Sequence, residues 1–327
     1  RRQVAEGRHH RPYEWLGAHP IVVAGVAGTR FAVWAPAARR VSVVGSFNNW
    51  DGRRHMMRLR VECGTWEIFI PHVGEGDLYK FEVLGADGQL RIKADPFAFR
   101  AEMRPRTASV VQRLLPGVAI DDARRRANAL DAPVSIYEVH LGSWRKGKTY
   151  LELAEELVEY VTWQGFTHVE FLPVSEHPFE PSWGYQVTNY FAPQSRLGRP
   201  DEFRHLVDKL HQAGIGVIMD WVPGGFCADS HGLATFNGHM LFEHEIHPNW
   251  GTHKFDFARG EVRSFLVSNV LYWLENFHVD GIRMDGVSSM LYLNFGIDDP
   301  SQKKFNKYGT EEDLDASAFI RQVNRSE

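Results

Sequence analysis

The sequence predicts a protein of two parts, an all-β sandwich followed by an α/β region that forms an incomplete (β/α)8 TIM barrel. Two observations carry this prediction. Short β-branched and aromatic runs, separated by turn residues, fill residues 1–110, which is typical of a β-sandwich. From Val134 onward, strand-like runs alternate with stretches of helical periodicity, which is the pattern of parallel βα units.

The sandwich prediction depends on four runs that have strand composition, at 31–35, 41–44, 65–70 and 78–83. Turn formers such as Pro36 and Gly45 lie between them. Trp50 and Trp66 in this region allow two interpretations. Their rings are candidates for a platform that binds sugar rings, or they pack in the core, where aromatic side chains contribute most of the buried area.

Residues 111–133 are expected to link the two parts, with one helical turn, because Pro116, Gly117 and charged residues dominate them. The arginine run at 124–126 is interpreted as a solvated face.

The barrel region is placed at 134–327. Its expected strands are 134–140, 167–174, 215–222 and 281–287, and its expected helices are 150–161, 201–213, 261–277 and 311–324. Long loops follow the strands, at the end where (β/α)8 barrels place their active sites. A doubly wound sheet would fit the same alternation, but no glycine-rich phosphate turn follows His140.

Composition excludes several classes of function. The chain has 327 residues, 43% of them hydrophobic and 24% charged, as in ordinary globular proteins. Its net charge of −4 gives no basic surface for nucleic acid, and no apolar run is long enough for a membrane span. Two cysteines far apart in sequence suit a reducing compartment, so we expect a cytoplasmic protein. We also expect a monomer. Because the chain begins without methionine, we expect that upstream sequence is missing.

Polar side chains gather where the last two strands end. Arg283 and Asp285 alternate with apolar residues, so they share one face of their strand. A guanidinium beside a carboxylate favours the ionised carboxylate, which a nucleophile needs. Asp220 closes the preceding strand. Taken alone, Arg283 and Asp285 would more often be a structural ion pair, and Asp220 a turn or cap residue.

The loop after the second strand carries Trp183, Gly184, Tyr185 and Gln186. Together with the carboxylates and the arginine, these aromatic and amide groups suit an uncharged, polyhydroxylated ligand such as a sugar. Carboxylates and amides bind hydroxyl groups, and aromatic rings cover the apolar faces of the sugar.

Two motifs resemble signatures of the α-amylase superfamily, glycoside hydrolase family 13: Asp-Trp-Val-Pro-Gly at 220–224 and Asp-Gly-Ile-Arg-Met-Asp-Gly-Val at 280–287. Three further segments are similar to bacterial 1,4-α-glucan (glycogen) branching enzymes, at 182–186, 190–193 and 211–216. Residues 13–20 and 41–52 resemble the N-terminal glucan-binding module of these enzymes, carbohydrate-binding module family 48.

The resemblance implies glycogen or α-glucan branching, in which α-1,4 links are cleaved and α-1,6 branches form by retaining transfer. Asp285 would be the nucleophile and Arg283 would hold it. Asp220, Tyr185, Gln186, His140 and Trp183 would line the sugar site. In the module, Trp50, Trp66 and Lys80 would bind glucan. No cofactor is implied.

The sequence departs from the family pattern in two ways. Gly225 stands where the family has a histidine that hydrogen-bonds the sugar. The acid/base glutamate of the fifth strand and the His-Asp pair of the seventh are absent, and Glu311, Glu312 and Glu327 lie in or after the last helix, where they cannot replace them. We therefore expect a fragment without transferase activity of its own.

Two other functions stay open. In the first, the chain is a non-catalytic glucan-binding protein with a degenerate amylase-type barrel. In the second, it is a trehalose-releasing or debranching hydrolase, against which the loop at 183–186 argues.

The histidine-rich loop at 231–253 raises the question of a metal. Besides His231, four histidines and two glutamates lie in it: His239, His244, His247, His253, Glu243 and Glu245. Their spacing fits no standard zinc pattern, so no metal is expected.

Overall fold

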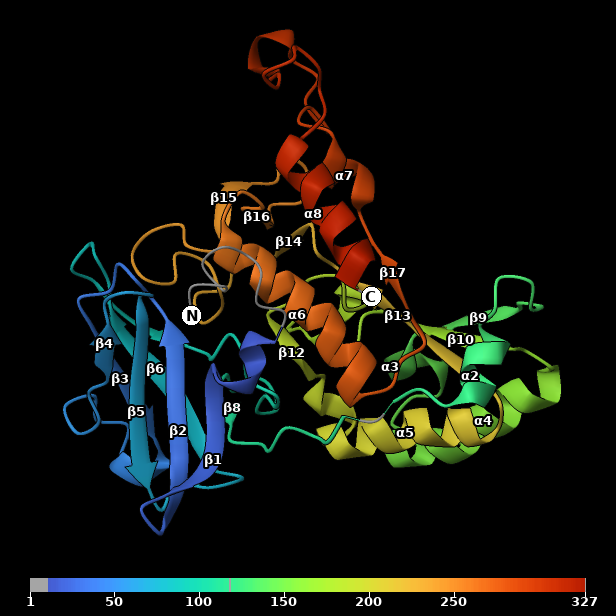
Figure 1. Ribbon diagram of the computed structural model, residues 1–327, viewed down its shortest axis with the longest axis horizontal. Helices are drawn as coiled ribbons and strands as arrows, with labels where there is room; N and C mark the ends of the chain where they lie inside the picture. The colour runs from blue at the N-terminus through green and yellow to red at the C-terminus, as the bar shows by residue number, and fades with distance from the viewer. Residues whose placement is uncertain (1–10, 118, 327) are drawn as a thin grey trace.

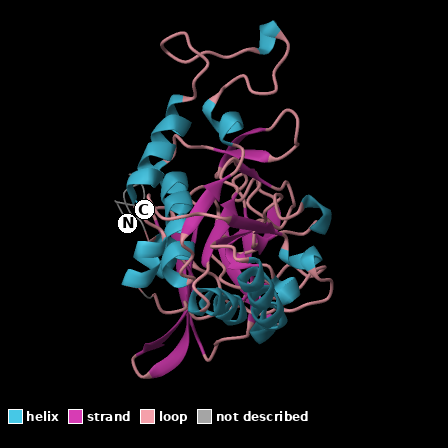
Figure 2. Cartoon of the chain, turned by 90° about the vertical axis from the view of Figure 1, so that its right-hand side faces the viewer, coloured by secondary structure: helices cyan, strands magenta, loops and turns pink. Residues whose placement is uncertain are grey.

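A computed structural model describes residues 11–117 and 119–326 of the chain, and it consists of a β-region beside an α/β region. Figure 1 shows the sandwich on one side, the parallel sheet with its helices on the other, and helix α6 between them. In the perpendicular view the strands lie in the interior and helices flank them (Figure 2). This arrangement confirms the predicted sandwich followed by an α/β region.

Two antiparallel sheets form the sandwich. The first has the order β1-β2-β5-β4 and the second β3-β6-β7, with β8 pairing β6. Ala24 and Gly25, both with positive φ, make the two-residue turn between β1 and β2, which suits a hairpin. The strands are β1 (Gly17–Val23), β2 (Val26–Trp34), β3 (Arg40–Gly45), β4 (Arg58–Arg60), β5 (Thr65–Pro71), β6 (Leu78–Leu84), β7 (Leu90–Lys93) and β8 (Ser109–Val110).

Trp66 corrects one sequence prediction. It lies on β5 with only 7% of its surface exposed, and its indole N–H donates to the carbonyl of Ala35 at 2.9 Å. The side chain points into the sandwich core, so its ring offers no platform to a sugar. Trp50, by contrast, is 42% exposed.

The linking segment contains helix α2 (Asp122–Ala127), which Asp121 caps by accepting from the Arg124 backbone N–H. The expectation of a solvated arginine face is wrong for Arg124. Its side chain is buried and its Nε lies 3.0 Å from Asp280 Oδ1. The ion pair with a distant carboxylate stabilises the buried guanidinium.

The α/β region contains a four-stranded parallel sheet of order β17-β13-β10-β9. Strands that follow one another in sequence are neighbours in space, as in a (β/α)8 barrel, of whose eight strands the sheet holds half. Its strands are β9 (Ile136–Val139), β10 (His168–Phe171), β13 (Gly216–Trp221) and β17 (Gly281–Met284), and its long helices are α4 (Tyr150–Gln164), α5 (Pro200–Gln212), α6 (Gly260–Asn276) and α8 (Leu314–Ser326).

Alternation along these strands separates two faces. Phe171, Val217 and Met219 are fully buried on the helix-covered face. On the other face Ile136 and Glu138 are exposed, because no layer covers them in the described part of the chain.

Shorter elements lie in the loops that follow the strands. They are α3 (Leu141–Trp144), α7 (Val287–Leu291), the hairpin of β11 (Ser175–Glu176) with β12 (Asn189–Pro193), and the small sheet of β14 (Gly225–Phe226), β16 (His253–Phe255) and β15 (Glu243–Ile246). None of the helices in residues 11–117 and 119–326 has the length and apolar character needed to cross a bilayer.

Candidate active site

Strand register brings the predicted polar residues together. In the parallel pair of β13 and β17, Asp220 lies opposite Arg283. The backbone N–H of Asp285 donates to Trp221 O at 2.9 Å, which extends the pairing past the end of β17. Gly286, with a φ of +68°, is the N-cap residue of α7, so Asp285 lies in the short turn between β17 and α7.

Arg283 bridges two carboxylates. Its Nη1 lies 3.0 Å from Asp220 Oδ2 and 3.0 Å from Asp285 Oδ1. The two acids differ in access, since the Asp220 side chain is 0% exposed and that of Asp285 is 33% exposed. A ligand can therefore reach Asp285 directly, whereas Asp220 lies behind the arginine.

Tyr185 completes this cluster. Its hydroxyl donates to Asp220 Oδ2, and Arg283 Nη1 lies 3.4 Å from the same hydroxyl. Burial raises the pKa of Asp220, while the hydrogen bonds from Tyr185 and Arg283 oppose that shift. Gly184 allows the loop that carries Tyr185 to pack closely against Pro173, because a Cβ on residue 184 would lie 2.4 Å from Pro173 O.

A cavity of about 340 Å³ opens beside Asp285. Three residues that the sequence predicted to belong to a sugar site line this cavity: Tyr185, Gln186 and Asp285. Several other lining residues were not predicted to belong to that site. The residues that line it are Ser182, Tyr185, Gln186, Val222, Gly224, Gly225, His247, Trp250, Thr252, Asp285, Gly286 and Ser289. Its size and its mixture of hydroxyl, amide and aromatic groups suit a sugar ring.

Two predicted residues lie elsewhere. His140 has its Nδ1 2.7 Å from Ser143 Oγ, and Trp183 is 62% exposed. Neither lines the cavity beside Asp285. Their place in a sugar site stays a prediction.

His247 and Trp250 carry the two aromatic rings of the cavity lining that sequence reasoning did not assign to the site. His247 was considered only as a metal ligand, and Trp250 not at all. The pattern His-Pro-Asn-Trp at 247–250 was the available signal, because it places a histidine and a tryptophan three residues apart in a loop.

Gly225 is required by its surroundings. A Cβ built on it would lie 2.5 Å from the backbone oxygen of His253, because β14 pairs with β16 there. The histidine that the sequence resemblance leads us to expect at this position would therefore place its Cβ too close to that oxygen in this backbone arrangement.

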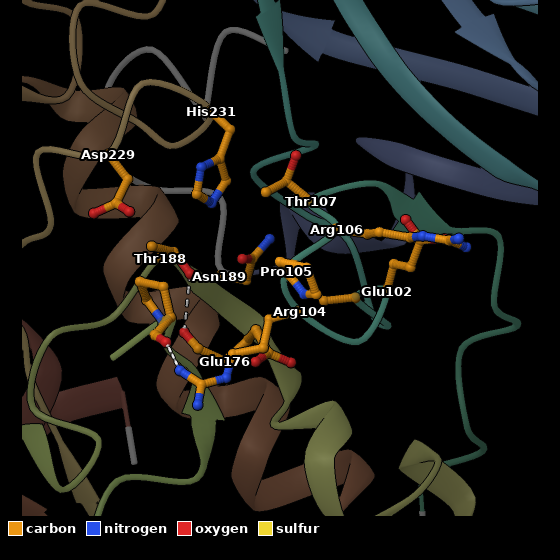
Figure 3. Close-up of a pocket in the computed structure, with 12 residues that line it drawn as sticks. Glu102, Arg104, Pro105, Arg106, Thr107, Glu176, Thr188, Asn189, Asp229 and His231 are labelled. Carbon is orange, nitrogen blue, oxygen red and sulfur yellow. Dashed lines mark hydrogen bonds and ion pairs between the residues drawn. The ribbon is translucent and has the colours of Figure 1, made fainter. Parts of the chain in front are cut away.

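A second cavity, of about 510 Å³, lies between the sandwich and the α/β region (Figure 3). The segment that follows β7 contributes Glu102, Arg104 and Arg106, and loops of the α/β region contribute Asp229 and His231. Asp285 does not line it, so the chemistry of the strand ends lies in the smaller cavity.

Of the three residues predicted to bind glucan in the module, two line a common cavity and one does not. Trp50 and Lys80 line one shallow cavity of about 490 Å³ on the sandwich, and Lys80 Nζ donates to Thr107 Oγ1 at 3.0 Å. Trp66 is not part of it.

In the histidine-rich loop, the two glutamate side chains contact histidine side chains. His253 Nδ1 lies 3.0 Å from Glu243 Oε2, and His244 Nε2 lies 3.2 Å from Glu245 Oε1. Within the described ranges no group of three or more His, Cys, Asp or Glu side chains is placed to hold a metal ion.

Comparison with known proteins agrees with this architecture. The fold is similar to that of an α-amylase-type protein from Salmonella typhimurium, with a TM-score of 0.66, 24% identity and 88% of this chain covered. It is also similar to pullulanase from Paenibacillus barengoltzii, in a mutant complexed with maltotetraose, with a TM-score of 0.66, 22% identity and 84% covered. The chain therefore has an amylase-like fold, and it spans 45% and 50% of those two structures.

The N-terminal part is assigned more closely. Residues 15–98 match the family model of carbohydrate-binding module 48, the isoamylase N-terminal domain. The sandwich is thus a module of this family, as its sequence resemblance indicated.

Proposed function

We propose that this chain binds α-1,4-glucan and supplies the nucleophile, Asp285, of a retaining glucan transfer that makes α-1,6 branches. One observation carries the proposal: Arg283 joins two carboxylates at adjacent strand ends, and the accessible one faces a cavity of sugar size. The module of residues 15–98 and the amylase-like fold support an α-glucan as the ligand.

The proposed chemistry uses two displacements. A carboxylate oxygen of Asp285 bonds to C1 of a glucosyl unit while the bond from C1 to the leaving oxygen breaks. That oxygen takes a proton from solvent and departs with its chain. The 6-hydroxyl of an acceptor then attacks C1, passes its proton to solvent, and releases the Asp285 carboxylate with the original configuration restored.

Arg283 would hold Asp285 in position through the 3.0 Å ion pair, and Tyr185 and Asp220 would support the arginine from behind. Among the described residues that line the cavity, Asp285 is the one carboxylate. The proton for a poor leaving group such as a glucan oxygen therefore has no carboxylic acid donor in that lining.

An activated donor isolates the nucleophilic step. Fluoride leaves from α-maltosyl fluoride without needing a proton, so the chain should release fluoride from it while leaving amylose unbranched in an iodine-staining assay. Asp285→Asn should abolish release. Asp298→Asn makes the same change at an exposed aspartate that does not line the cavity, and it should behave as wild type. Equal release by wild type and Asp285→Asn would refute the assignment of the nucleophile.

Product linkage tests the branching assignment. With α-maltosyl fluoride as the activated donor and maltoheptaose as acceptor, any maltosyl group transferred should be joined by a new α-1,6 link visible by NMR, whereas hydrolysis should give free maltose. The sequence similarity of residues 182–186 to branching enzymes favours the first outcome. Exclusive formation of maltose would instead favour a hydrolase.

A non-catalytic glucan-binding protein is the second candidate, and the shared cavity of Trp50 and Lys80 on the module favours it. In that case wild type would release no fluoride, and Asp285→Asn would bind maltoheptaose as tightly as wild type in calorimetry. Trp50→Ala would then remove most of the binding.

A further inference from the structure

The tautomer of His247 is fixed by its own loop. The backbone N–H groups of Asn249 and Trp250 both donate to His247 Nδ1, at 3.1 and 3.2 Å. A nitrogen that accepts hydrogen bonds carries no proton, so the proton of the neutral ring lies on Nε2. Burial lowers the pKa of this histidine, which favours the neutral ring.

The Nε2–H group is left without a partner. His247 is 3% exposed, and its Nε2 is buried with no hydrogen bond to any described atom. A buried, unmatched donor costs free energy, so it calls for an acceptor that the described protein atoms do not supply. His247 is one of the residues that line the cavity beside Asp285.

Trp250 adds an aromatic surface next to this donor. Its ring stacks on His247 with centroids 3.9 Å apart and planes within 5°. The tryptophan is nevertheless 53% exposed. Its Cζ3 and Cη2 lie 3.9 Å from where a Cβ on Gly286 would stand, and Gly286 directly follows Asp285. An exposed ring therefore stands beside the candidate nucleophile.

We propose that His247 and Trp250 together recognise the glucosyl unit that Asp285 attacks, an inference that rests on the function proposed above. Trp250 covers the apolar face of the sugar, and His247 Nε2–H donates to one of its hydroxyl groups. Because Gly225 leaves no room for a ring at its own position, the imidazole of this cavity wall comes from His247. The ligand class is an uncharged hexopyranose.

Paired substitutions separate the donor from the loop. In His247→Asn the amide oxygen replaces Nδ1 as acceptor for the two backbone N–H groups, but the Nε2 donor is lost. His247→Gln retains a donor near Nε2. With α-maltosyl fluoride, we expect His247→Asn to raise KM about tenfold with a smaller change in kcat, and His247→Gln to recover part of the loss.

The tryptophan is tested in the same assay. Trp250→Ala should raise KM about tenfold, and Trp250→Phe should restore part of it. Trp163→Ala is the matched control, because Trp163 is also an exposed tryptophan and does not line the cavity. Thermal melting of each variant shows whether the loop has kept its fold.

The outcomes separate this inference from the proposed function. If Asp285→Asn abolishes fluoride release while His247→Asn and Trp250→Ala leave KM unchanged, the inference is overturned and the function stands. If wild type releases no fluoride, the inference is tested by calorimetry, which measures the binding of maltoheptaose to variants that also carry Trp50→Ala. Weaker binding by the added His247→Asn or Trp250→Ala supports the inference, and unchanged or absent binding in that background overturns it.

Discussion

At the scale of single residues, Asp220 and Asp285 differ in their access to solvent. Asp220 is fully enclosed and receives hydrogen bonds from Tyr185 and Arg283. Asp285 shares the same guanidinium but is one-third exposed. Under the proposed function, the enclosed Asp220 would hold the arginine and the exposed Asp285 would contact the substrate.

Removing the arginine tests that division. Arg283→Ala leaves the buried Asp220 carboxylate without its cationic partner, and we expect unfolding to become easier by roughly 2–4 kcal/mol, measured by urea denaturation. Arg283→Lys should cost less, since a charge remains, but a lysine cannot hold both carboxylates in one fixed plane. A loss below about 0.5 kcal/mol in Arg283→Ala would contradict the proposed coupling.

Two adjacent glycines provide an internal control for the crowding at position 225. Gly225→Ala places a Cβ 2.5 Å from His253 O and should destabilise the protein by about 1–3 kcal/mol. Gly224→Ala meets Met290 Cγ at 3.6 Å, an ordinary contact, and should be nearly neutral. Thermal or urea unfolding measures both. Equal stability of the two variants would show that the backbone of β16 at His253 shifts to accept the Cβ without a cost in the free energy of unfolding.

At the scale of elements, the Asp280 side chain connects the start of β17 to three other elements, α2, α5 and β13. Its carboxylate accepts from Arg124 of α2 at 3.0 Å, from His211 of α5 at 2.6 Å and from the backbone N–H of Val217 in β13 at 2.7 Å. The strand that carries Arg283 and Asp285 is therefore anchored at its opposite end by this cluster.

The anchor predicts a pH dependence. Burial alone would raise the pKa of Asp280, but the hydrogen bonds lower it from its ordinary value of 3.8 to about 2. The carboxylate thus contributes roughly 2 kcal/mol above pH 3.8, and this is lost as pH falls from 3.8 through about 2. Asp280→Asn should remove that contribution at pH 7, measured by urea unfolding.

The matched control for Asp280 is Asp131→Asn, which changes an exposed aspartate. It should leave the free energy of unfolding unchanged to within about 0.5 kcal/mol. If the acid-dependent part of the stability curve is the same in wild type and Asp280→Asn, the anchor does not titrate as described.

The long helices and the strands of the parallel sheet could be predicted from local pattern, whereas only four of the eight sandwich strands were predicted. The helix expected at 201–213 is observed at Pro200–Gln212, because its apolar spacing and its proline start are local signals. Arg124 was misassigned because its partner, Asp280, lies 156 positions further along the chain. Periodicity in a charged run carries no information about such a partner.

In the candidate site, too, residues on regular strands could be predicted and residues in an irregular loop could not. Asp220, Arg283 and Asp285 could be predicted because strand alternation and parallel register are regular. His247 and Trp250 could not, because they lie in an irregular loop whose path depends on tertiary contacts. Trp66 was open between two interpretations until β5 placed its ring in the core.

At the scale of the whole molecule, the two parts share an aromatic core. Phe97, which follows the last long strand of the sandwich, lies 4.9 Å from Phe191 and 5.2 Å from Phe265 of the α/β region, between ring centroids. Phe99 stacks on Tyr272 of α6 at 5.4 Å. Such contacts favour cooperative unfolding of both parts. The boundaries at 110 and 134 stay a proposal, which limited proteolysis would test.

A buried lysine makes the second connection between the parts. Lys93, at the end of β7, is 2% exposed and donates to Ser230 O and Ala234 O, both at 2.7 Å, in a loop of the α/β region. Burial lowers the pKa of Lys93 to about 8. The carbonyl oxygens solvate the charge only in part, and no carboxylate forms an ion pair with this ammonium group among the described residues.

This lysine gives the fold an alkaline signature. Between pH 8 and 10.5 the unfolded chain binds the Lys93 proton more tightly than the folded chain does, so this group makes stability rise with pH. Relative to Lys93→Met, the free energy of unfolding of wild type should rise by about 1 kcal/mol from pH 8 to pH 9. Lys146→Met, which changes an exposed lysine, should show no such difference. Because other groups also titrate in this range, the comparison is made between variants at each pH. Parallel stability curves for wild type and Lys93→Met would mean that the ammonium group is solvated at the junction of the two parts and does not couple them.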